Sequence, residues 1–259
     1  SSDLNSMSSR AIPVSKQIQQ IIENPATPVF WGLNQSGMSA KEEHPNIDAC
    51  KGDWKAIAEE YAAFADVLKE QNLHKQIVNR VLEPFTYIDV VVTATDYANW
   101  FALRLDKDAQ PEIQQLAQVM KDAMDASKPV LLNPGEWHLP YITGSDIASV
   151  SNYLAYIQDG HDSPSRRLDL LKKISAARCA RTSYKAFDGK VASIDDDLSL
   201  FDKLMSGEIK HSSPTEHQAT PDYINYWDGE IEFVSPWLHG NFKGWVQYRK
   251  TIPNEFIEG

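Results

Sequence analysis

The chain has 259 residues and a formal net charge of −11, and 42% of its residues are hydrophobic, 10% aromatic and 24% charged. This composition is typical of a globular protein, and the length is enough for one large domain or two small ones. The negative charge argues against a general nucleic-acid-binding protein, which needs a basic surface, although a few local arginines could still hold one phosphate.

Apolar residues recur at helical spacing through most of the first half of the chain. Residues 16–23 are expected to form a helix that ends before Pro25, and residues 29–52 look like a loop because they contain several glycines and a proline. Asp53 is the expected N-cap of the next helix, which continues to Leu68. Further helices are expected over residues 73–81 and 110–126.

The second half is expected to begin with a connector, residues 129–145, which contains Glu136-Trp-His138. Alternating aromatic and aliphatic residues from Tyr223 onward indicate strands. The spacing of apolar residues predicts helices over residues 145–157, 164–180 and 195–205.

The two cysteines, Cys50 and Cys179, fit no metal-ligand spacing and lie far apart in the sequence. A disulfide framework is therefore not expected, and a reducing compartment is the default. No apolar run approaches the roughly 20 residues that span a bilayer, and no signal peptide is visible. We expect a cytoplasmic protein that does not act at a membrane.

Two N-terminal segments combine arginine with small polar residues. The first, Asn5–Arg10, has hydroxyls and a closing arginine that suit a phosphate, although taken alone it is more typical of a disordered terminus. The second, Asn79–Pro84, places Arg80 where a helix should end. Taken alone, Arg80 is typical of the basic residues that stabilise the C-terminal end of a helix.

A third segment runs from Asn99 to Ile113 and sets an amide, an aromatic pair and Arg104 just before a helix. Arginine after an apolar run has little reason to be there for packing alone. Taken without other information, Arg104 is equally consistent with a surface ion pair.

A fourth region contains Ala176–Tyr184 and, after a predicted helix, His211–His217. The second stretch places two imidazoles and a carboxylate in one tight turn, which invites a zinc site. Zinc needs a further ligand, and the sequence offers no obvious one, so no metal is predicted.

Together the four segments resemble the motifs of the flavin-dependent thymidylate synthases. The family has Ala-Ala-Arg-x-Ser-Tyr, Gly-His-x-Ser-Pro-Phe-Glu-His, an Arg-His-Arg element that leads into Ser-x-Asn-Glu-x-Ser-x-Arg-Tyr, and Asn-x-Phe-x-Leu-Arg. Here the third of these motifs comes first and Ser183 and His211 come last, as a circular permutation in a phage-type relative would give. The similarity covers segments 3–13, 75–120 and 174–221.

The resemblance implies the roles of nine residues. Ser8, Arg10 and Arg80 would bind the nucleotide, and Arg104 would contact the pyrimidine ring and polarise it. FAD would be bound by five others: Asn99, Ser183, His211, Ser213 and Glu216. The implied reaction is C5 methylation of a deoxypyrimidine monophosphate, dUMP to dTMP, with methylenetetrahydrofolate as carbon donor and NAD(P)H as reductant.

The resemblance also implies an α+β fold, with helices packed on a mainly antiparallel sheet, and a homotetramer with sites shared between subunits. It predicts a single domain over 1–259, made of a nucleotide-site half (1–128), a connector or insert (129–173) and a flavin-site half (174–259). It further predicts that residues 86–104 are mostly helical, in spite of their β-branched run.

Several departures from the family pattern leave alternatives open. Asp3, Ser6, Ala11, Asp108 and Thr215 replace residues common in the family, and the Arg-His-Arg element would precede Ser1. The first alternative is a dCMP methylase, or a dCMP or dUMP hydroxymethylase that makes modified viral DNA bases in the host cytoplasm. The second is a non-catalytic flavin- or nucleotide-binding relative. The third is an unrelated helical interaction protein.

Overall fold

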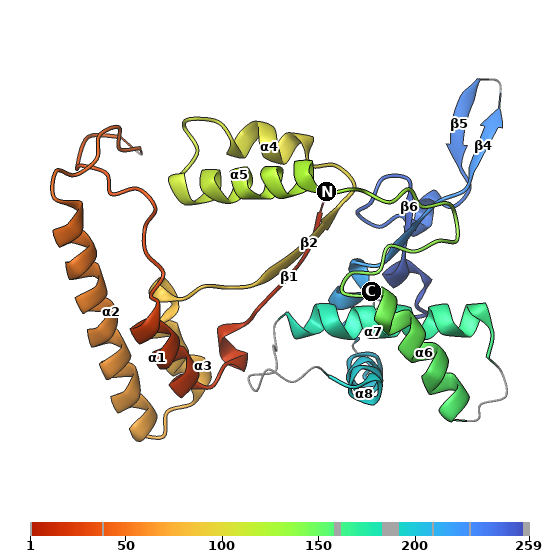
Figure 1. Cartoon of the computed structure of the whole chain (residues 1–259), viewed down its shortest axis with the longest axis horizontal. Coiled ribbons are helices and arrows are strands. Elements are labelled where there is room, and N and C mark those ends of the chain that lie inside the picture. Colours follow the sequence, from red (N-terminus) through yellow and green to blue (C-terminus); the bar gives the residue numbers. More distant parts are fainter. Residues whose placement is uncertain are drawn as a thin grey trace. The chain divides into compact units, whose positions relative to one another are not determined.

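The computed structural model describes residues 2–37, 39–157, 162–182, 192–208, 210–227 and 229–255. The chain forms two compact units (Figure 1). We call them the N unit, residues 8–88 and 96–129, and the C unit, residues 1–7, 89–95 and 130–259.

Among the described residues of the N unit the regular elements are helices, and one isolated antiparallel bridge joins Gly32 to Glu43. Helix α1 (Val14–Glu23) packs against the long helix α2 (Ile47–Glu70). The buried side of α2 consists of alanines at helical spacing, whose small side chains let the two helices approach closely: Ala58, Ala62 and Ala65. The other elements are η1 (Ser9–Ala11), α3 (Lys75–Val78), η2 (Asn79–Val81), η3 (Glu83–Phe85), α4 (Ala98–Arg104) and α5 (Pro111–Ala126).

The prediction that Asp53 caps the second helix is wrong. Helix α2 begins at Ile47, and the side chain of Asn46 accepts a hydrogen bond from Ala49 N at 3.3 Å. Gly52 is carried inside the helix with open space around it, so it does not break the helix as the sequence suggested. The helix expected over 73–81 is α3 followed by the tighter turn η2.

The C unit contains three longer helices, all of them predicted: α6 (Gly144–Tyr156), α7 (Pro164–Arg181) and α8 (Ile194–Met205). Helix α7 is the most buried and packs against both α6 and α8. Short 3₁₀ turns follow: η4 (Ser213–Glu216), η5 (Pro236–Leu238) and η6 (Tyr248–Thr251). The side chains of Phe201 and Tyr248 stack within this core.

The prediction that residues 86–104 are mostly helical is wrong for its first part. The β-branched run forms strand β2 (Val90–Ala94), which pairs antiparallel with β1 (Ser2–Ser6) in the register Asn5↔Val91. Helix begins only at Ala98. The pairing also means that the serine-rich terminus is an ordered strand.

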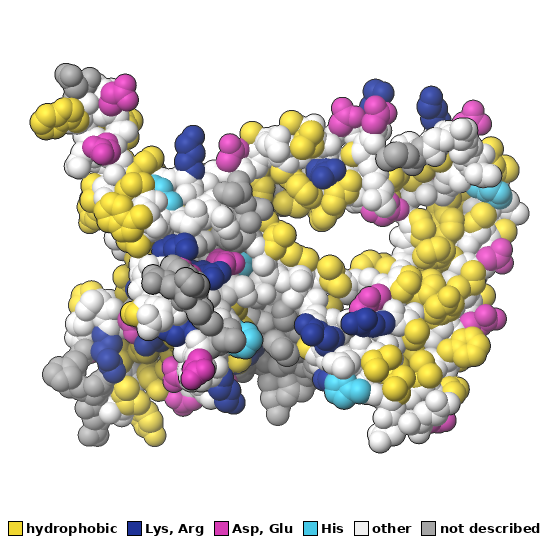
Figure 2. Space-filling model, turned by 180° about the vertical axis from the view of Figure 1, so that it is seen from behind, with side chains coloured by type: hydrophobic (Ala, Val, Ile, Leu, Met, Phe, Trp, Pro, Cys, Tyr) yellow, Lys and Arg dark blue, Asp and Glu magenta, His cyan; other side chains and the backbone are white. Residues whose placement is uncertain are grey.

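The remaining strands form two more antiparallel pairs, β3 (Ala219–Pro221) with β6 (Trp245–Gln247), and β4 (Ile224–Trp227) with β5 (Glu230–Phe233). The described residues are thus a mixture of helices and small antiparallel sheets, consistent with an α+β class, and each sheet has two strands. The β4–β5 hairpin stands away from the helices of its unit (Figure 1), and Figure 2 shows hydrophobic and acidic side chains side by side on it.

A search of the described residues for a membrane-spanning helix finds none of sufficient length and apolar character.

Candidate functional site

The two N-terminal arginine segments lie against each other in the N unit. The buried side chain of Asn79 donates from Nδ2 to the backbone oxygens of Ser9 at 2.7 Å and of Ile12 at 2.9 Å. The Ser9 hydroxyl donates to Glu83 at 2.7 Å, and the Lys75 ammonium donates to Ala11 O at 3.1 Å. These contacts join segments about 70 positions apart into what we call the Asn79 surface, residues 8–12 and 75–83.

The Asn79 surface is positively charged although the chain as a whole is acidic. It carries Arg10, Lys75 and Arg80 with a single carboxylate, Glu83. Arg10 and Arg80 are exposed, and no described carboxylate forms an ion pair with either. The Ser8 hydroxyl accepts a long contact from Arg10 Nε at 3.4 Å. The exposed Arg10 guanidinium beside this hydroxyl is suited to binding a phosphate through charge-assisted hydrogen bonds, and Arg80 adds a second exposed positive charge to the same surface.

Arg104 and Asn99 lie on helix α4 of the same unit, and both are exposed. The Arg104 guanidinium lies 5.9 Å from the centre of the Trp100 ring, a cation–π contact between residues four apart on one helix face. Asn99 is five positions before Arg104 and therefore points about 140° away around the helix. The structure thus does not place Asn99 and Arg104 on one face.

The predicted flavin residues that the structure describes in the C unit lie in or just before η4: His211, Ser213 and Glu216. His211 and Ser213 are exposed polar side chains that could contact a flavin or its phosphates. Glu216 differs, because its carboxylate forms an ion pair with Arg249 and its backbone oxygen accepts a hydrogen bond from Gln247 Nε2 at 3.0 Å. Glu216 therefore has a clear structural role in holding η4 to η6. The predicted Ser183 lies outside the described residues.

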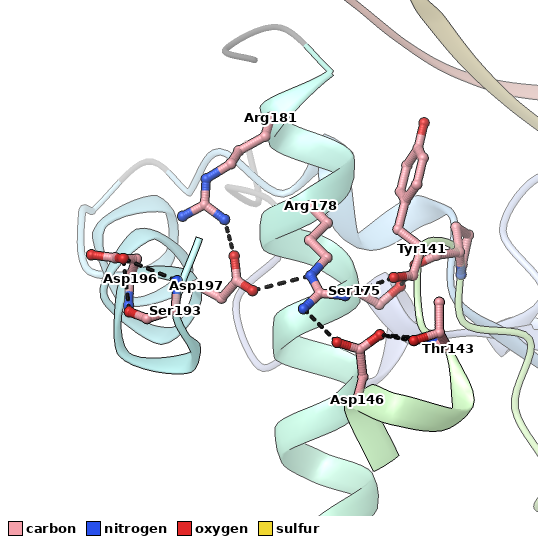
Figure 3. A network of polar contacts seen from close by, with 10 residues as sticks. Tyr141, Thr143, Asp146, Ser175, Arg178, Arg181, Ser193, Asp196 and Asp197 are labelled. Carbon is pink, nitrogen blue, oxygen red and sulfur yellow. Dashed lines mark hydrogen bonds and ion pairs between the residues drawn. The ribbon is translucent and has the colours of Figure 1, made fainter. Parts of the chain in front are cut away.

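A network of arginines and aspartates connects the three C-unit helices (Figure 3). Arg178 Nε donates to Asp197 Oδ2 at 3.1 Å, and Arg178 Nη2 donates to Asp146 Oδ1 at 2.8 Å. Arg178 Nη1 also donates to the backbone oxygen of Tyr141 at 2.8 Å. Arg181 donates to the other oxygen of Asp197, which is fully buried. A buried carboxylate needs such partners, so the network fixes α7 against α6 and α8.

The electrostatics of this network follow from its contacts. The hydrogen bond from Arg178, with further bonds from Thr143, holds the pKa of Asp146 well below its usual range. Asp146 Oδ2 accepts from Thr143 N at 2.8 Å, so the same carboxylate caps the start of α6. Partial burial lowers the pKa of Arg181.

The network borders a cavity of about 450 Å³. Its described lining residues are Asp89, Val90, Tyr141, Arg178, Arg181, Thr182 and Ala192. The sequence singled out the segment 176–184 but gave no sign of the aspartate partners, which come from separate helices. Two arginines at positions i and i+3 among the small and apolar residues of the last two turns of α7 are the one signal that could have indicated the network.

Within the part of the chain that the structure describes, no group of three or more His, Cys, Asp or Glu side chains is arranged to hold a metal ion. The two imidazoles of the segment 211–217 are in different settings, since His211 is exposed while His217 is buried and contacts Thr93 Oγ1 at 2.9 Å.

No family model matches the chain, and neither a curated protein nor a solved structure does. The function is therefore argued from the motifs and the local geometry.

Proposed function

We propose that this chain is an FAD-dependent enzyme that methylates C5 of a deoxypyrimidine monophosphate, dUMP to dTMP. Methylenetetrahydrofolate would supply the carbon and NAD(P)H the reducing equivalents. One observation carries the proposal. Segments 8–10 and 79–80, assigned to the nucleotide from separate sequence motifs, are hydrogen-bonded to each other through Asn79. Chance similarity of two motifs would give no reason for them to meet.

The Asn79 surface would hold the phosphate of the nucleotide. Ser8 would donate through its hydroxyl, and Arg10 and Arg80 through their guanidinium groups, which can each bind two phosphate oxygens. Asn79 holds the backbone oxygens of Ser9 and Ile12, so the backbone that carries Ser8 and Arg10 is fixed before the ligand arrives. Such preorganisation reduces the entropy lost on binding.

Arg104 would act on the base. C5 of a pyrimidine is a weak nucleophile, and negative charge develops on the ring as it attacks the methylene carbon. A guanidinium held near O2 and N3 stabilises this charge, and a preorganised contact of this kind contributes about 3–4 kcal/mol. The contact with Trp100 restricts the Arg104 side chain before substrate binds.

FAD, once reduced by NAD(P)H, would supply the hydride, and the exposed His211 and Ser213 side chains of the C unit are available to contact it. The chemistry needs no cysteine nucleophile. In agreement, burial raises the pKa of Cys179 to about 12, so this thiol is a poor source of thiolate.

A direct test is to incubate the protein with FAD, methylenetetrahydrofolate, NADPH and either dUMP or dCMP, and to detect products by mass. We expect retained FAD and a methylated product from dUMP. A product from dCMP would replace the proposed substrate, and a hydroxymethylated product would replace the proposed hydride transfer by addition of water. A protein that binds no flavin and converts neither nucleotide would contradict the proposal.

Arg104→Ala separates catalysis from stability in the same assay. Because Arg104 is exposed, the variant should melt close to wild type while turnover falls by about 10²–10³-fold. Equal losses of melting temperature and activity would instead indicate a structural arginine.

A further inference from the structure

The β4–β5 hairpin of the C unit holds large apolar side chains in solvent. All four residues of β4 are exposed, and so are the first three of β5. Trp227 is 80% exposed, Tyr226 72% and Ile231 59%. The hairpin stands away from the helices of its unit (Figure 1). Exposed aromatic residues gathered in this way are typical of surfaces that bind another macromolecule.

The pairing register places these side chains on two faces of different character. Residues directly opposite each other in an antiparallel pair share a face, and successive residues of a strand alternate between the faces. The apolar face consists of two opposite pairs, Tyr226 with Ile231 and Ile224 with Phe233. The acidic face consists of two other pairs, Trp227 with Glu230 and Asn225 with Glu232. Acidic and apolar residues therefore alternate along β5.

The base of the hairpin is fixed to the rest of its unit. The buried carboxylate of Asp222 accepts from Ser235 N at 2.7 Å and contacts His239 Nε2 at 2.9 Å. The ring of Phe233 packs edge-on against His239, with 5.1 Å between the ring centres. A strand that is held in place before a partner arrives loses less entropy on binding.

The outer edge of β5 is suited to pairing with a further strand. Among the described strands, this sheet consists of β4 and β5 alone. An unpaired strand edge presents backbone N–H and C=O groups, to which an extended segment of another chain can add. A third strand would also stabilise the hairpin, because a two-stranded sheet is marginally stable by itself.

The charges of the acidic face select the partner. Glu230 and Glu232 are exposed, no described cation forms an ion pair with either, and the sequence has no lysine or arginine between Ser212 and Phe242. A strand added beside β5 places every second side chain next to these carboxylates, where a basic residue is favoured and an acidic one is not. Pairing with β5 of a second copy would place glutamates beside glutamates, or bring a glutamate onto the apolar face, so a second copy is the poorer partner.

We propose that the β4–β5 hairpin binds an extended segment of another protein, in which basic and apolar residues alternate, as a third strand at the edge of β5. The apolar residues of the segment pack beside Ile231 on the apolar face. Its basic residues lie beside Glu230 and Glu232 on the acidic face. None of these hairpin residues is assigned above to nucleotide or flavin, so the inference stands apart from the proposed reaction.

The test is a fluorescence-anisotropy titration of the whole protein into a labelled peptide of three Lys-Val repeats at low salt. The control peptide is Lys-Lys-Lys-Val-Val-Val, which has the same composition and charge but cannot place its valines on one face and its lysines on the other. We expect saturable binding of the alternating peptide and about tenfold weaker binding of the control, because several cross-strand pairs are lost. Equal binding of the two peptides, or no binding of either, would overturn the inference.

Two exposed substitutions locate the binding on the hairpin. Ile231→Thr and Glu232→Lys should each weaken binding of the alternating peptide by about threefold or more, because each changes a side chain next to the added strand. Ile147→Thr on α6 and Glu70→Lys on α2 make the same changes at other exposed positions and should bind like wild type. Unchanged binding in both hairpin variants, or equal losses in the two controls, would contradict the proposed site.

Other occupants of the hairpin give different results. A higher oligomer in wild type that is lost in Ile231→Thr, measured by analytical ultracentrifugation, would assign the hairpin to a second copy of the chain. Co-sedimentation with phosphatidylcholine vesicles that is lost in Trp227→Ser would assign it to a lipid surface. Either result overturns the inference.

Discussion

The two cysteines occupy different environments. Cys179 is fully buried on α7, and burial raises its pKa to about 12. Cys50 is half-buried near the start of α2, with its sulfur 3.4 Å from His44 Nδ1. The reactivity of a thiol follows its thiolate fraction and its accessibility. We therefore expect the Cys50 thiol of the native chain to be more reactive than the Cys179 thiol.

We predict that a thiol reagent at pH 8 labels native protein at Cys50 and not at Cys179. With a pKa of about 12, only about one Cys179 in ten thousand is a thiolate at that pH. The measurement is mass spectrometry of peptides after timed labelling, with Cys50→Ser as the control that should stay unlabelled until urea is added. Labelling of Cys179 at the rate of Cys50 would show that α7 opens readily.

Asp146 links two elements, since one of its oxygens caps α6 and the other accepts from Arg178 on α7. Its pKa is lowered in the folded state, chiefly by the bond from Arg178. The stability that this pKa difference supplies is therefore fully present above the unfolded-state value of about 3.9, and is lost as pH falls further toward the lower folded-state value.

We predict that Asp146→Asn lowers the free energy of unfolding by about 1.5–3 kcal/mol at pH 7, the usual range for a hydrogen bond to a charged group. The difference from wild type should shrink as pH drops below about 4. Urea unfolding at a series of pH values measures it. The control is Asp162→Asn, which removes the exposed pair with Arg167 and should have a smaller effect. A difference that stays constant down to pH 2 would contradict the assignment.

At the scale of helices and strands, the sequence predicted most of the helices. Apolar periodicity within one segment is enough to indicate a helix, because it does not depend on distant residues. Helices α5, α7 and α8 begin and end within a residue or two of the predicted positions. Strand β2 was missed although its β-branched run is a local strand signal, because the family resemblance was given more weight than that signal. Its pairing with β1, about 85 positions away, has no local signal in the sequence. The partnership of Arg178 with Asp146 and Asp197 was missed for the same reason.

On the scale of the whole molecule, the sequence singled out the two segments of the Asn79 surface. The sequence indicated Asn79 only as part of a motif. No sequence pattern predicts that a buried amide will donate hydrogen bonds to two distant backbone oxygens. The motif similarity also grouped Glu216 with the flavin residues, whereas the structure pairs its carboxylate with Arg249. An ion pair 33 positions apart could not be foreseen from either residue.

The central claim is that the Asn79 surface holds a nucleotide phosphate, and calorimetric titration with dUMP tests it most directly. Wild type should bind dUMP, and Arg10→Ala or Arg80→Ala should each weaken binding by about tenfold or more, because each removes a charge-assisted contact. Lys41→Ala, which removes an exposed charge of the same unit outside this surface, should leave the affinity unchanged. Equal affinity in all four proteins, or no binding of dUMP by wild type, would contradict the account.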